Sequence, residues 1–196
     1  MNRGKRLVVR GGSIAAGHGV KRGYVQILAE TLGNAGIEVV NSSRFGDTSF
    51  DGIWTFSRDI EPYAPDALLI HFGVDDAYFP VYRSEFKENL VRMVGRSREL
   101  FSPLIYIATS HTFDDPYDME AVNIFYRAIR EVCVDLDCHL VPVHTYWAGF
   151  LQDHWLSNRD LVCPDTRYPN EQGHEVFAKV IGGRILRLAG ESERPR

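Results

Sequence analysis

The sequence has too few cysteines and too little basic charge for several specialised classes of protein. Its three cysteines, Cys133, Cys138 and Cys163, are odd in number and lack the spacing of metal ligands, so we expect thiols rather than a disulfide framework. The 22 basic residues are outnumbered by 26 acidic ones, which leaves a net charge of -4 and no basic stripe for a phosphate backbone. We therefore expect no nucleic-acid partner.

The chain also has no apolar run long enough to span a membrane. The charged segment 1–6 is followed by only a few apolar residues before glycines intervene, which is too short for the apolar core of a signal peptide. These absences predict a cytoplasmic protein with no membrane span. The sequence gives no indication of the oligomeric state.

The composition is sufficient for one folded domain. The chain has 196 residues, of which 44% are hydrophobic, enough for one full core but too few for two. We predict a single domain over residues 1–190, followed by a frayed, charged tail at 191–196. No internal repeat or low-complexity linker interrupts it.

Short apolar runs alternate with longer stretches of helical periodicity, which is typical of an α/β protein with a parallel sheet flanked by helices. Strands are predicted at 6–10, 37–41, 67–72, 103–109 and 139–143. Helices are predicted near 21–34, 50–62, 84–100, 118–136 and 171–189. Asn170 is a plausible N-cap for the last of these helices.

The segments that follow the predicted strands are polar and rich in glycine. Ligands bind beyond the carboxyl ends of the strands in an open α/β sheet, so these segments are the candidate site. They contain Ser13, the run 41–46, Gly73 with Asp75 and Asp76, His111 and His144, and the segment 165–170 precedes the last helix.

The glycine-rich turn around Ser13 does not match three common motifs. A Walker A loop requires a lysine where His18 and Gly19 follow, and the G-x-G-x-x-G spacing of a dinucleotide site is missing. The nucleophile elbow of α/β-hydrolases requires glycine two positions after the serine, where this chain has Ala15. With these three motifs excluded, the remaining interpretation is a serine in the turn that follows the first strand.

The order of these landmarks resembles the SGNH, or GDSL, hydrolase family. The matching blocks are residues 11–14, Gly46, residues 71–76 and residues 165–174, which together extend over nearly the whole chain. The resemblance implies a flavodoxin-like, three-layer α/β/α sandwich with a mostly parallel, five-stranded sheet. It also implies hydrolysis of carboxylic esters, thioesters or acetylated sugars, with no metal or cofactor.

Two residues that perform chemistry in that family are replaced here. Ser13 and Gly46 match, and Gly46 retains the backbone N–H that the family uses to bind the oxyanion. However, Asp75 stands in place of the family's asparagine, Tyr168 in place of its histidine, and Gly12 where aspartate is usual. Asp165 matches the carboxylate that orients the histidine in an intact triad.

These replacements predict a weakened site. Tyrosine titrates near pH 10, so Tyr168 is a poor base for a serine hydroxyl at neutral pH. An ionised Asp75 accepts hydrogen bonds but cannot donate one to an oxyanion, and the loss of one such donor typically adds roughly 2.7 to 4 kcal/mol to the barrier.

Another histidine could act as the base. His111, at the predicted end of the fourth strand with acidic residues nearby, is the best candidate, although it also fits a loop residue bonded to backbone. His18 could fold back over the serine turn. Carboxylates at Asp75, Asp76 and Asp165 could offer oxygen ligands, but no recognised loop spacing supports a metal site.

Three hypotheses follow for the function. In the first, the residues around Ser13, including Gly12, Gly46, Gly73 and Asp75, bind a small acyl ester or acetylated sugar, and ordinary esterase activity is weak or absent. In the second, the chain is an active serine hydrolase with a replacement base such as His111. In the third, the groove of the former active site binds a protein partner.

Overall fold

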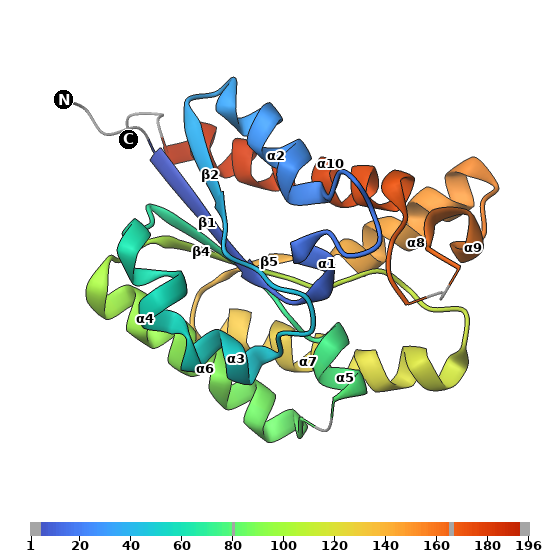
Figure 1. Cartoon of the computed structure of the whole chain (residues 1–196), viewed down its shortest axis with the longest axis horizontal. Helices are drawn as coiled ribbons and strands as arrows, with labels where there is room; N and C mark the ends of the chain where they lie inside the picture. The colour runs from blue at the N-terminus through green and yellow to red at the C-terminus, as the bar shows by residue number, and fades with distance from the viewer. Residues whose placement is uncertain (1–4, 80, 165–166, 193–196) are drawn as a thin grey trace.

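A computed structural model describes residues 5–79, 81–164 and 167–192 as a sheet enclosed by two layers of helices (Figure 1). The sheet has five strands in the order β2-β1-β3-β4-β5, and each neighbouring pair is parallel. This is the flavodoxin-like order, so the predicted fold class is confirmed. The strands are β1 Lys5–Gly11, β2 Ile37–Asn41, β3 Ala67–His71, β4 Leu104–Ala108 and β5 His139–Val141.

Helices cover both faces of the sheet (Figure 1). On one face lie α2 Tyr24–Gly33, α8 Val143–His154 and α10 Glu171–Ser192. On the other lie α3 Ser49–Trp54, α4 Phe56–Asp59, α6 Arg83–Leu100 and α7 Pro116–Asp135. Shorter helices are α1 Ser13–Ala16, α5 Val74–Tyr78, α9 Asn158–Leu161 and the 3-10 helix η1 Glu61–Tyr63.

The central strands contain continuous apolar runs because helices bury both of their faces. The runs 7–9 of β1 and 68–70 of β3 are completely buried, and so is the side chain of Arg10. The parallel register places Gly11 opposite His71. As a result the turns that follow β1 and β3 lie side by side.

Some predicted elements differ from the structure. The helix predicted near 50–62 is divided into α3, α4 and η1, because Thr55 leaves the helical conformation and Pro62 starts a new turn. The strand predicted at 139–143 ends at Val141, and Pro142 instead precedes the unpredicted helix α8. The last helix continues to Ser192, and the rest of the tail, 193–196, lies outside the described residues.

Two further findings concern the cysteines and the helices. The three cysteines are all thiols. In the part of the chain that the structure describes, no helix combines the length and the apolar character needed to cross a membrane.

Candidate active site

The turn after β1 places Ser13 at the carboxyl edge of the sheet. Gly11 ends the strand and Ser13 begins α1. A Cβ on Gly11 would lie 2.4 Å from the carbonyl oxygen of His71, and one on Gly12 would lie 2.1 Å from Asp75 Oδ2. Only glycine fits such close approaches, and Gly12 leaves the space that the Asp75 carboxylate occupies.

Asp75 accepts both hydrogen bonds that Ser13 can donate from its backbone and side chain. The Ser13 backbone N–H donates to Oδ2 at 2.7 Å, and the Ser13 hydroxyl donates to Oδ1 at 2.6 Å. Asp75 is 4% exposed, and burial raises the pKa of its carboxyl group although the hydrogen bonds from Ser13 oppose this. The carboxylate therefore holds both the serine hydroxyl and a backbone N–H of the oxyanion-hole type.

Gly46 contributes a further backbone donor to the same serine. Its N–H donates to Ser13 Oγ at 3.0 Å. The residue has φ +76°, a left-handed conformation that favours glycine. The Ser13 oxygen thus accepts one hydrogen bond and donates another, and the Ser13 residue is completely buried.

An ion network around the buried side chains of Arg10 and Asp59 holds the loop that carries Gly46. Arg10 Nη2 lies 2.6 Å from Asp47 Oδ2 and 3.5 Å from Asp59 Oδ2. Arg44 also pairs with Asp59 through two hydrogen bonds. Burial alone would raise the pKa of Asp59, but the bonds from Arg44 and Arg58 hold it far below its usual range.

The sequence analysis did not identify this network, although one signal was present. Arg10 is a charged residue that continues the apolar run 7–9 of a central strand. A charge in a buried strand requires a partner of opposite sign, so acidic residues in the following loop could have been sought.

Tyr168 contacts the site through Asp75. Its hydroxyl donates to Asp75 Oδ1 at 3.4 Å, and the residue is 9% exposed. The ring of His18 meets Tyr168 edge-on, with centroids 5.0 Å apart, and packs on Phe45 at 4.0 Å. His18 is therefore beside this cluster, as the alternative that it folds back over the turn requires.

His111 is in the core. Its side chain is completely buried against Phe113 and Trp147, and its Nδ1 shares a hydrogen bond with Ser110 Oγ at 3.0 Å. Burial lowers the pKa of His111 to about 3. Within the described ranges, the contacts of His111 do not include Ser13.

The remaining predicted residues have simpler positions. Gly73 precedes α5 with φ +121°, and its N–H donates to Asp76 Oδ2 at 2.9 Å. Asp165 lies outside the described residues. Among the residues that are described, no three histidine, cysteine, aspartate or glutamate side chains gather to hold a metal ion.

Comparison with known proteins identifies the family. A model of the GDSL-like lipase/acylhydrolase family matches residues 9–176 of this sequence. The chain belongs to this family. Two relatives of this GDSL-like member are an arylesterase of Vibrio mimicus, 19% identical over 93% of this chain and 89% of that protein, and esterase TesA of Pseudomonas aeruginosa, 25% identical over 74% of each.

Solved structures share the fold of this GDSL-like chain. A catalytic variant of Axe2, an acetylxylan esterase from Geobacillus stearothermophilus, superimposes with a TM-score of 0.82 at 20% identity and covers 94% of this chain and 95% of its own. LAE5, an alpha/beta hydrolase enzyme from the metagenome of Lake Arreo in Spain, superimposes with a TM-score of 0.81 at 21% identity. The match covers 94% of this chain and 96% of LAE5.

The donors around Ser13 in this GDSL-like site are hydrogen-bonded within the protein. Nucleophilic attack needs a group that removes the serine proton and free donors that stabilise the oxyanion. Here the Ser13 proton and the Ser13 N–H both point at the Asp75 carboxylate, and the Gly46 N–H points at Ser13 Oγ. Three donors near the reacting centre are thus already engaged within the protein.

Proposed function

We propose that this chain is a divergent GDSL-like protein that binds a small acyl ester or an acetylated sugar around Ser13, with weak or absent esterase activity. The observation that carries the proposal is the double hydrogen bond from Ser13 to Asp75. The arylesterase, esterase and acetylxylan esterase named above support the ligand class.

The weak activity has two physical causes. Asp75 occupies the Ser13 backbone N–H, a donor that would stabilise negative charge on a substrate oxygen, and a carboxylate would also repel that charge. Tyr168 supplies a hydroxyl that donates to Asp75 rather than a ring nitrogen that accepts from Ser13. Loss of a base and a donor together lowers turnover by several powers of ten in hydrolases of this kind.

The test is to restore the two family residues. The variant Asp75→Asn with Tyr168→His returns an amide donor and an imidazole base. We expect its turnover of 4-nitrophenyl acetate to exceed that of the wild type at least about 100-fold. The added Ser13→Ala substitution should abolish that gain, which excludes hydrolysis by surface groups.

The opposite result would show a rewired active site. In that case the wild type would hydrolyse the ester through Ser13, and the two restoring substitutions would reduce the rate. Circular dichroism of each variant, with comparable spectra, confirms that the rates compare folded proteins.

A further inference from the structure

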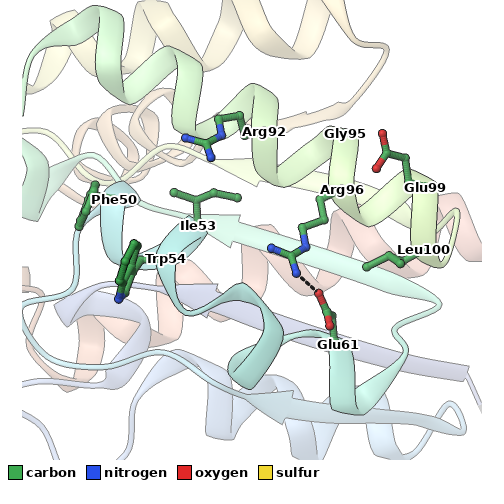
Figure 2. A pocket seen from close by; sticks show the side chains of 9 residues that line it. All are labelled: Phe50, Ile53, Trp54, Glu61, Arg92, Gly95, Arg96, Glu99 and Leu100. Carbon is green, nitrogen blue, oxygen red and sulfur yellow. Dashed lines mark hydrogen bonds and ion pairs between the residues drawn. The ribbon is translucent and has the colours of Figure 1, made fainter.

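A hollow of the described surface lies between α3 and α6, away from Ser13. Its volume is about 860 Å³. Figure 2 shows Phe50 and Trp54 on one side of it, from α3, and Arg92 and Arg96 on the other, from α6. We call this hollow the α3–α6 groove.

The packing of α3 explains why its aromatic residues face outward. A Cβ on Gly52 would lie 2.8 Å from the ring of Phe72 and 2.9 Å from Met93 Sδ, so this point of the helix is pressed against the sheet and α6. Phe50 and Trp54 are two positions before and after Gly52, on the opposite side of the helix. They are 47% and 78% exposed.

The two aromatic rings stack on one another and form an exposed aromatic strip along α3. Their centroids are 6.1 Å apart and their planes differ by only 11°. The strip is anchored at its start, because the Ser49 backbone N–H donates to the buried Asp76 carboxylate at 2.9 Å. A rigid, exposed aromatic strip provides apolar contact with little loss of side-chain entropy.

The charges in the groove cancel. Arg96 pairs with Glu61, and its guanidinium also lies 4.8 Å from the ring centroid of Phe56 (Figure 2). Arg92 and Glu99 line the same groove. Among the described residues, neither of them has a hydrogen-bond or ion-pair partner. Balanced donors and acceptors suit a neutral ligand with many hydroxyl groups better than an anion or a cation.

A glycine within α6 leaves the groove open. Gly95 lies inside an 18-residue helix, where glycine costs about 1 kcal/mol relative to alanine. A Cβ there would meet no atom within 4 Å, so packing does not require glycine at this position. The missing side chain keeps space beside the aromatic strip.

A second hollow shares Phe50 with the groove. It has a volume of about 500 Å³ and is lined by Gly46, Thr48, Phe50 and Phe79. Phe50 borders both hollows, and the Gly46 N–H donates to Ser13 Oγ. A ligand along α3 would therefore extend toward Gly46, whose N–H holds the completely buried Ser13.

We propose that the α3–α6 groove binds a neutral, extended oligosaccharide and directs one end of it toward Ser13. The rings of such a chain present flat C–H faces to Phe50 and Trp54, and its hydroxyl groups meet Arg92 and Glu99. The direction toward Ser13 rests on the proposed function, whereas binding in the groove needs no ester.

Calorimetric titration with xylohexaose, cellohexaose and mannohexaose, which carry no ester, tests the groove directly. We expect at least one to bind, with an affinity at least about 10-fold lower in Trp54→Ala and in Gly95→Leu. Two matched variants should leave the affinity unchanged: Trp155→Ala, at a tryptophan that is 96% exposed, and Gly183→Leu, at an exposed glycine of α10 with no atom near its Cβ.

Three results would overturn the proposal. They are the absence of binding to all three hexasaccharides, equal binding by the wild type and both groove variants, or a dimer in sedimentation that Trp54→Ala dissociates. The last would show that a second copy of the chain covers the groove. Ser13→Ala should retain hexasaccharide binding, so failure of the function proposed for Ser13 would leave this result intact.

Discussion

Asp75 and Gly12 fit one another at the residue scale. The carboxylate of Asp75 lies where a side chain at position 12 would begin, 2.1 Å from an ideal Cβ. The chain therefore lacks a side chain at position 12 and has a carboxylate at position 75. The family usually has aspartate at the first of these positions and asparagine at the second. These two departures from the family are physically linked.

A double-mutant cycle measures this link. Gly12→Ala should reduce the free energy of unfolding by about 1 to 3 kcal/mol, because its Cβ overlaps with the Asp75 carboxylate and with the carbonyl oxygen of Asp47. In the Asp75→Ala background the first overlap disappears and the cost should be smaller. Urea denaturation of the four proteins gives the coupling, and additive effects would contradict the link.

The same site shows what sequence could and could not predict about residues. The blocks containing Ser13, Gly46, Asp75 and Tyr168 were found from their order, and the structure brings these four residues together. The direction of the Asp75 hydrogen bonds could not be predicted, because it depends on the distance between two turns that are 62 residues apart in sequence. The burial of His111 was missed for a similar reason, since the apolar groups around it come from several elements.

At the scale of elements, the strands were predictable because each contains a short apolar run. This run is buried in β1, β3 and β4 and partly exposed in the edge strands β2 and β5. The break in the helix near 50–62 was not predictable from periodicity alone. Thr55 accepts a bond from Arg10 and donates one to the Asp51 carbonyl, so a tertiary contact with β1 fixes the point where α3 ends. This break orients the exposed aromatic strip of α3 beside α6.

At the scale of the whole molecule, buried histidines link stability to pH. His71, His111 and His174 are nearly or completely buried, and burial lowers the pKa values to about 3, 3 and 4. The unfolded chain binds these protons near pH 6.5, so the stability present above that pH decreases as pH falls toward 4. Burial also raises the pKa of Asp75 and raises that of Asp76 to about 6. These two carboxyl groups bind protons more readily in the folded chain than in the unfolded chain, so they oppose part of this loss of stability as pH falls.

The substitution His111→Phe removes one of these three proton-binding side chains, so it measures the contribution of His111 to the pH dependence. Between pH 4 and 6 we expect the free energy of unfolding to change less steeply in the variant than in the wild type, by about 1.4 kcal/mol per pH unit. The measurement is urea denaturation at several pH values. A loss of packing shifts the whole curve without changing its slope, so equal slopes in the two proteins would contradict the assignment.

The most direct test of the central claim is the reactivity of Ser13 toward a fluorophosphonate probe, measured by intact mass. The wild type, Ser13→Ala, and the variant with Asp75→Asn and Tyr168→His are incubated beside an active esterase of the family. Because Asp75 holds the Ser13 hydroxyl, we predict no adduct on the wild type and a Ser13-dependent adduct on the restored variant. An adduct on the wild type that disappears in Ser13→Ala would contradict the claim, because it would show an activated nucleophile.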